Sequence, residues 1–400
     1  MSTIEKHDMT QGKILLPLVS FTIPLVLGNL FQLTYNAADS VIVGKYVGEQ
    51  ALAAVGTSTP IMNIAILLIS GMCMGASVLM SSQYGAKDYD TLSRQISTTM
   101  LAGCGFSVVF SLLMLLLANP VLRLIRVPET AIPEAAAYLR IIFMGLIFTF
   151  MYNFLANTMR ALGDSKTPLY FLVTSAFLNI FGDLFFVVVL RWGVAGSAIA
   201  TVCSEGLCCL LCGIYIKKKI PLLCLGKKWW VFDKSLLGKT VSYGSTSAMQ
   251  QVCLQLGKLI IQSVVNTQGV AVMAAFTAVN RVDDFAYTPQ QNIGHAMTTF
   301  LAQNKGAGHK ERMKKGFQTG LLIELVYSIG LFCVIWGLAP QIMTLFAEDG
   351  DAQVVSLGIS YLHLISWMYI LPGLTNGVQG FFRGIGDLKV TLYSTFMNMF

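Results

Sequence analysis

Long apolar runs separated by short polar segments follow one another along almost the whole chain. A helix needs about 20 predominantly apolar residues to cross a bilayer, and the complete runs all reach that length. We expect membrane-spanning helices near residues 15–44, 52–82, 95–119, 136–158, 168–190, 194–216, 236–265, 270–302, 317–339 and 352–381, with an eleventh beginning at 389–400. The pattern therefore predicts an all-α polytopic membrane protein.

The composition and the charge pattern agree with this prediction. Hydrophobic residues make up 55% of the chain and charged residues 12%, against about 25% charged in a typical soluble domain. The net charge of +7 is compatible with nucleic-acid binding, but in such a protein Lys and Arg collect in the cytoplasmic loops. Most of them fall in alternate loops here, and the opposite loops hold only Lys45, Arg123, Arg126, Arg140 and Arg191. We expect a multi-pass protein of the inner (cytoplasmic) membrane with a cytoplasmic amino terminus, which binds no nucleic acid.

The nine cysteines indicate neither a disulfide framework nor a metal centre. All except Cys224 lie within apolar runs, where Cys behaves as a small hydrophobic residue. Cys209 and Cys212 form a C-x-x-C pair, but no second pair or strand–turn context accompanies it. We expect the cysteines to pack between helices, and we expect no cofactor.

An internal repeat divides the chain. Residues Arg160–Lys166 (RALGDSK) recur as Arg383–Lys389 (RGIGDLK), and Asn153 upstream matches Asn376. Duplicated halves are common in transporters. We expect an amino-terminal lobe at 1–216, a cytoplasmic linker at 217–235 and an incomplete carboxy-terminal lobe at 236–400. The repeat also predicts a twelve-span parent that is truncated here within its eleventh span.

Polar residues form a stripe on the first span of each half. At about 100° per residue, the spacing of Asn29, Gln32, Asn36 and Asp39 puts them on one helix face, and Gln251, Gln255, Lys258 and Gln262 do the same in the seventh span. The stripes are explained by polar contacts between helices or by a water-lined cavity between the halves, and we favour the cavity. The expected cavity residues are Asn29, Gln32, Asn36, Glu205, Gln251, Gln255, Lys258, Asn280 and Asp284.

The first half contains carboxylates without basic neighbours. Asp39, Asp183 and Glu205 lie in spans that contain no Lys or Arg, so they must bind protons or a metal cation unless water reaches them. Counted at 1.5 Å per residue, Asp39, Asp183 and Thr201 share one depth, and Asn179 lies one turn from Asp183. These oxygens suit sodium, whereas Asp39 alone would suffice as a proton carrier.

The second half differs in charge. Lys258, Arg281, Asp283 and Asp284 nominally cancel, which leaves Glu324 near the cytoplasmic end and His363 in the tenth span. Arg281 and Asp284 either form a buried ion pair or contribute to a cavity wall. In the first half, Gly71 and Gly75 form a G-x-x-x-G motif, which predicts close helix packing.

Taken together, two parallel halves, Asp39 in the first span, Asn179 with Asp183 in the fifth, and the paired R-x-x-G-D-x-K loops resemble the multidrug and toxic compound extrusion (MATE) family. The resemblance implies a two-lobed, V-shaped monomeric antiporter. Such proteins export drugs, organic cations and other amphipathic compounds in exchange for sodium ions or protons. By position, the resemblance assigns Asp39, Asn179, Asp183 and Thr201 to the cation site of the first lobe, where they would be metal ligands if the ion is sodium.

One departure from the family pattern refines this assignment. The NorM-like and eukaryotic branches carry an acidic residue in the seventh span, where this chain has Gln250, Gln251 and Gln255. That favours the DinF-like branch, with ion coupling in the first lobe. The alternatives are a lipid-linked oligosaccharide flippase of the same superfamily and a membrane-embedded enzyme. The sequence has no HExxH or GxSxG motif, so we expect a transporter and not an enzyme.

Overall fold

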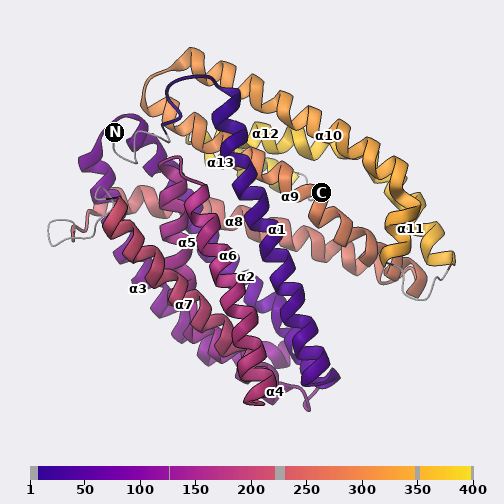
Figure 1. The fold of residues 1–400 in the computed structure, drawn as a ribbon. Helices are drawn as coiled ribbons and strands as arrows, with labels where there is room; N and C mark the ends of the chain where they lie inside the picture. Colours follow the sequence, from indigo (N-terminus) through magenta and orange to yellow (C-terminus); the bar gives the residue numbers. More distant parts are fainter. Residues whose placement is uncertain (1–7, 126, 221–229, 347–351, 398–400) are drawn as a thin grey trace. The chain divides into compact units, whose positions relative to one another are not determined.

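The computed structural model describes residues 8–125, 127–220, 230–346 and 352–397, and these contain helices and no strands. The elements are α1 (Leu15–Tyr46), α2 (Glu49–Gly85), α3 (Tyr89–Leu124), α4 (Ile132–Met144), α5 (Leu146–Ala161), α6 (Lys166–Asp183), the π-helix η2 (Leu184–Val189), α7 (Gly193–Lys219), α8 (Lys234–Val265), α9 (Val270–Gly306), α10 (Lys310–Phe346), α11 (Ala352–Met368), α12 (Ile370–Gly384) and α13 (Leu388–Met397). Figure 1 shows them along the chain. The predicted all-α architecture is confirmed. Within the described residues, each expected span overlaps one helix, a bent pair of helices or, for 168–190, α6 and the π-helix that continues it.

Membrane-spanning character is strongest in the first half. Within the described residues, six helices are long and apolar enough to cross a membrane individually, and two bent pairs raise the number to eight. The bent pairs are α4 with α5, at 46°, and α11 with α12, at 41°. Helices α8 and α9 are long enough but more polar, and α8 carries the Gln and Lys stripe predicted above.

The contacts divide the chain into two compact units. Unit 1 comprises residues 1–8 and 27–251, and unit 2 comprises residues 9–26 and 252–400. In unit 1, α2, α3, α4, α5 and α7 surround a core that contains Leu139, Phe143, Phe150 and Phe154. In unit 2, α9 packs against α10, α11 and α12. The predicted lobes at 1–216 and 236–400 stay a prediction, and residues 221–229 of the predicted linker lie outside the described residues.

The helix bounds repeat the duplication seen in the sequence. Helices α2 and α9 both have 37 residues, and each starts directly after a glycine with positive φ, Gly48 at 117° and Gly269 at 100°. The two R-x-x-G-D-x-K segments both connect a bent pair to the next helix, and their central glycines, Gly163 and Gly386, have φ of 91° and 83°. These positions need glycine because a Cβ atom is costly at positive φ.

Close helix packing at the G-x-x-x-G motif is confirmed. A Cβ atom placed on Gly71 would lie 2.5 Å from the Cα atom of Ala248 in α8, and one on Gly75 would overlap the backbone at Tyr243. On the other side of the contact, a Cβ atom on Gly244 would lie 3.2 Å from the Cα atom of Met72. The glycines therefore let the backbones of α2 and α8 approach more closely than any larger residue allows.

The buried pair considered for Arg281 and Asp284 is not formed. Asp284 instead pairs with Lys258 of α8, with 3.1 Å between Nζ and Oδ1, and the two side chains are 52% and 64% exposed. A lysine on a separate helix reaches the carboxylate, so Arg281 is not needed to neutralise it. The pair is exposed, and we assign it little stabilising free energy.

Candidate functional site

Asp39 of α1 is held by a serine of α7. The Ser197 hydroxyl donates a hydrogen bond of 2.6 Å to Oδ1 of Asp39, and Ser197 is fully buried. Hydrogen bonds to an ionised acceptor are about twice as strong as neutral ones. Ser197 therefore fixes one oxygen of Asp39 and leaves the other available to a second group.

Asp183, Asn179 and Thr201 lie beside this pair. Asn179 and Asp183 are one turn apart on α6 and are 3% and 0% exposed. The Asn179 side-chain amide donates to Oγ1 of Thr201 at 3.2 Å, and the Thr201 hydroxyl donates to the backbone carbonyl of Ser197 at 3.1 Å. The carboxyl groups of Asp183 and Asp39 are close enough to interact electrostatically. The structure thus brings together all four residues predicted for the cation site.

Several side-chain oxygen atoms at the candidate site receive no hydrogen bond from the described residues. Among the described residues, none donates a hydrogen bond to either carboxylate oxygen of Asp183 or to Oδ1 of Asn179. The two ion pairs found among the described residues, Arg94–Asp233 and Lys258–Asp284, involve neither site carboxylate. The site therefore has buried acceptors and two acidic groups but no basic side chain paired with them.

The local backbone explains how α6 and α7 come this close. A Cβ atom on Gly182 would lie 2.9 Å from Cβ of Ala200, and one on Gly196 would lie 3.1 Å from the backbone oxygen of Phe186. Directly after Asp183 the α-helix changes to the π-helix η2, whose wider turn places Phe186 against α7. Single π-helical turns inside α-helices occur frequently at functional sites.

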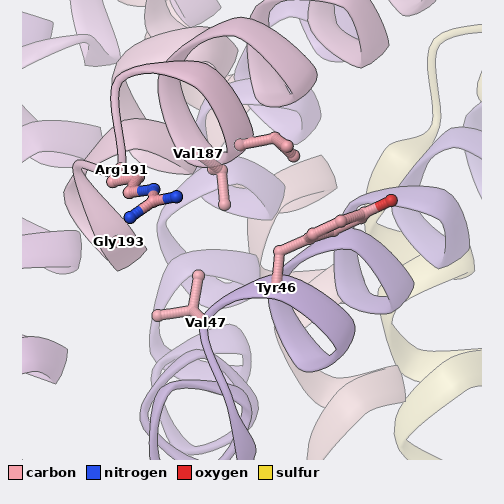
Figure 2. A pocket seen from close by; sticks show the side chains of 6 residues that line it. Tyr46, Val47, Val187, Arg191 and Gly193 are labelled. Carbon is pink, nitrogen blue, oxygen red and sulfur yellow. The ribbon is translucent and has the colours of Figure 1, made fainter.

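A pocket lies at the end of the helices that carry the site. It has a volume of about 420 Å³ and lies between the ends of α1, η2 and α7; its lining residues are Tyr46, Val47, Val187, Val188, Arg191 and Gly193. Figure 2 shows Val47 and Val187 facing each other across it, with Arg191 at its margin. Tyr46 and Val187 follow Asp39 and Asp183 by about two turns and one turn of helix, so the pocket is adjacent to the carboxylate pair.

The residues predicted for a substrate cavity are spread over both units. Glu205 of α7 accepts a hydrogen bond of 2.5 Å from the Thr149 hydroxyl inside unit 1. The α1 residues Gln32 and Asn36 are exposed and Asn29 is partly buried, whereas Gln251, Gln255 and Asn280 are partly buried and Lys258 pairs with Asp284. The cavity itself would lie between the units, and it stays a prediction.

Two features of the site were not predicted from the sequence. Ser197 precedes Thr201 by one helical turn and so lies on the same face of α7, and this spacing was the available signal. The π-helix has no comparable signal, because its sequence, LFFVVV, is compatible with an ordinary apolar helix.

Comparisons with known proteins identify the family of the chain. The family model MatE matches residues 24–185 and 247–400. The probable multidrug resistance protein YpnP of Bacillus subtilis (strain 168) is 32% identical over 392 residues, which cover 97% of this chain and 86% of that protein. The probable multidrug resistance protein NorM of Thermotoga maritima is 22% identical, covering 96% and 82%.

Solved structures show the same fold. An outward-facing multidrug resistance MATE family transporter of the MOP superfamily superposes with a TM-score of 0.92 at 23% identity, covering all of this chain and 88% of the other. A MOP superfamily transporter from Pyrococcus furiosus gives the same TM-score, identity and coverage, and is described as having a binding pocket of reversed polarity. The family match over most of the chain, together with the relative at 32% identity, shows that the chain belongs to the MATE family of membrane transporters.

Proposed function

We propose that this protein is a secondary active multidrug efflux antiporter that exports organic cations or amphipathic compounds in exchange for protons or sodium ions. One observation carries the coupling part of the proposal. Asp183 is fully buried, and within the described part of the chain its carboxylate oxygens receive no hydrogen bond and its acidic neighbour Asp39 pairs with no Lys or Arg.

The physical reason is the cost of an uncompensated charge. An ionised group in hydrocarbon costs about 3 kcal/mol or more unless it is neutralised or wetted. Two adjacent carboxylates increase this cost by mutual repulsion. A proton held by the pair, or a sodium ion between them, removes it. The ion-free state is therefore the less favourable one, which is the condition for coupling ion release to another event.

In this proposal the residues have distinct roles. Asp39 and Asp183 supply the negative charge, and Asn179 and Thr201 supply neutral oxygens that complete a sodium shell when sodium is the ion. Ser197 positions Asp39 through its 2.6 Å hydrogen bond. Ion binding at this site and substrate binding in the predicted cavity would favour different conformations and would so exclude each other.

We extend the proposal to the membrane location, the oligomeric state and the branch of the family. The distribution of Lys and Arg supports an inner-membrane protein with its amino terminus in the cytoplasm. The chain would act as a monomer and would belong to the DinF-like branch, because its seventh span lacks a carboxylate. The name of the relative at 32% identity, a probable multidrug resistance protein, supports drug-like substrates.

The flippase alternative depends on basic residues in the cavity that would bind a lipid-linked anion. The spans of the second half contain two such basic residues, Lys258 and Arg281, and Lys258 is already neutralised by Asp284. This observation favours the antiporter over the flippase.

The test is transport by reconstituted protein. Proteoliposomes receive a proton gradient or a sodium gradient separately, and ethidium efflux is followed by fluorescence. Asp39→Asn should abolish gradient-driven efflux, whereas Asp90→Asn, which neutralises an exposed carboxylate in the first turn of α3, should not. Unchanged efflux in Asp39→Asn would refute the coupling role, and transport that needs neither gradient would refute antiport.

A further inference from the structure

Unit 2 contains a buried acidic residue that the proposed function does not use. Glu324 lies on α10 and is 0% exposed, and neither of its carboxylate oxygens has a hydrogen-bond partner in the part of the chain that the structure describes. It belongs to unit 2, whereas Asp39 and Asp183 belong to unit 1. A lone carboxylate of this kind inside a membrane protein is a functional candidate by default.

Groups from three helices converge beside Glu324. A Cβ atom placed on Gly373 of α12 would lie 2.7 Å from Oγ of Ser328, 3.2 Å from Nε2 of Gln290 and 3.5 Å from Oε2 of Glu324. Gln290 belongs to α9 and Ser328 to α10, and both are 0% exposed. The missing side chain of Gly373 therefore keeps a small space open at the point where these polar groups meet.

The hydrogen-bond donors of Gln290 and Ser328 are already bonded to acceptors other than the Glu324 carboxylate. The Gln290 side-chain amide donates to Oγ of Ser328 at 3.0 Å and to the backbone oxygen of Tyr369 at 2.8 Å. The Ser328 hydroxyl donates to the backbone oxygen of Glu324 at 2.7 Å. Neither residue has a hydrogen left for the carboxylate, because a primary amide has two and a hydroxyl has one.

The atoms that remain unsatisfied in this space are acceptors. They are both carboxylate oxygens of Glu324 and Oε1 of Gln290, and the Ser328 oxygen retains a lone pair. Asn376, one turn beyond Gly373 on α12, has a buried Nδ2 without a partner, so that donor is not within hydrogen-bonding distance of Glu324. A cluster that lacks hydrogen-bond donors and carries a negative charge is stabilised by binding a cation.

Charged and titratable groups on the surrounding helices are engaged away from Glu324. The Tyr327 hydroxyl, next to Glu324 on α10, donates to the backbone oxygen of Ala286 at 3.0 Å. The remaining contacts are Tyr369 with Asp283, Lys258 with Asp284, Arg383 with His295, Tyr287 with Asn376 and His363 with the backbone oxygen of Trp336. Arg281 on α9 is exposed. Among the described residues, none of these cations forms an ion pair with Glu324.

We propose that Glu324, together with the side-chain oxygens of Gln290 and Ser328, forms a second binding site for a small monovalent cation, lying within unit 2. Carboxylate, amide and hydroxyl oxygens are hard ligands that suit sodium. A proton satisfies the same need, since a protonated Glu324 becomes a donor for the unpartnered Oε1 of Gln290. Both ions supply what the cluster lacks, and the experiment distinguishes between them.

The test uses Asp39→Asn, in which the proposed coupling site is disabled, so that the two proposals fail separately. Thermal unfolding of the purified protein in detergent is followed during a sodium titration against choline at constant ionic strength, and in a second series during a pH titration without sodium. We expect Asp39→Asn to retain a cation-dependent rise in Tm in one of the two series. Adding Glu324→Gln should remove that rise, because glutamine keeps the shape but not the charge.

A second pair of variants tests the geometry without altering charge. Gly373→Ala fills the open space and should raise the cation concentration for a half-maximal Tm shift at least tenfold. Gly330→Ala on α10, where an added Cβ atom meets nothing within 4 Å, should leave it unchanged. A response to sodium identifies a sodium site, and a response to pH alone identifies a proton site. The proposal is overturned if Asp39→Asn shows no cation response, or if its response survives Glu324→Gln.

Discussion

Replacing Asp183 by asparagine should stabilise the ion-free protein while destroying its coupling. The carboxylate is 0% exposed and receives no hydrogen bond from any described residue. Leaving a buried polar group unsatisfied costs about 1–3 kcal/mol, and more when the group is charged. Asparagine has the same shape, carries no charge and offers an amide hydrogen to the adjacent Asp39. We therefore expect Asp183→Asn to be more stable than the unmodified protein by at least about 1 kcal/mol when no coupling ion is present.

Saturation with the ion should reverse this order. A ligand that binds only the folded state stabilises it by about 2.7 kcal/mol at a hundredfold excess over Kd. The unmodified protein gains this free energy and Asp183→Asn does not. The two unfolding curves should therefore exchange order between choline buffer and the buffer that contains the coupling ion.

The assay is thermal unfolding in detergent, read by tryptophan fluorescence, together with dye efflux from proteoliposomes. Asp90→Asn serves as the matched control and should follow the unmodified protein in both buffers. If Asp183→Asn proves less stable than the unmodified protein without the ion, and still responds to the ion, then Asp183 is not an uncompensated charge and the coupling argument is wrong.

Two further predictions concern helix packing and capping. Gly71→Ala puts a Cβ atom 2.5 Å from the Cα atom of Ala248 and should lower Tm, since overpacking costs about 1–3 kcal/mol. Gly56→Ala lies in the same helix, where an added Cβ atom meets nothing within 4 Å, and should raise Tm because alanine is favoured over glycine by about 0.5–1 kcal/mol. A rise in Tm for both variants would contradict the close contact at Gly71. Asp88 caps α3 by accepting a hydrogen bond from the backbone N–H of Thr91 at 3.1 Å, and this bond lowers the pKa of Asp88 below its usual value of 3.8. Its stabilising effect is therefore present above that value and is lost as the pH falls through the lowered pKa. Asp88→Ala should cost about 0.5–1 kcal/mol at pH 7, and the difference in Tm from the unmodified protein should shrink as the pH falls below 3.8. A difference that stays constant as the pH falls would assign the effect to something other than the ionised cap.

The helices and their order could be predicted because each helix is determined by an apolar run in its own segment of the sequence. A run of apolar residues long enough to span the bilayer must satisfy its backbone hydrogen bonds internally. The breaks inside two of the spans have a tertiary cause. At Gly145, between α4 and α5, an added Cβ atom would lie 2.5 Å from Cγ2 of Val202 in α7. The hydrophobic pattern of residues 136–158 does not reveal this contact, so the break could not be predicted from it.

The residues of the candidate cation site could be named from the sequence, but the contacts between them could not. Buried carboxylates in lipid are rare enough that Asp39 and Asp183 stand out from the sequence alone. Ser197 does not, because a serine inside a helix usually bonds its own backbone, as Thr201 does. The choice of Lys258 over Arg281 as the partner of Asp284 likewise depends on which helices are neighbours.

The duplication explains why the two halves share a backbone conformation but differ in their charged residues. Gly48 and Gly269 begin equivalent helices with positive φ, and a side chain there would be strained in either half. Charged positions carry no such backbone requirement. Counted from the first residues of α1 and α8, Asp39 and Lys258 occupy the same place in helices of 32 residues. The lysine is neutralised by Asp284 within the protein, whereas Asp39 forms no ion pair with a base among the described residues, so of these two corresponding positions only Asp39 needs an external cation.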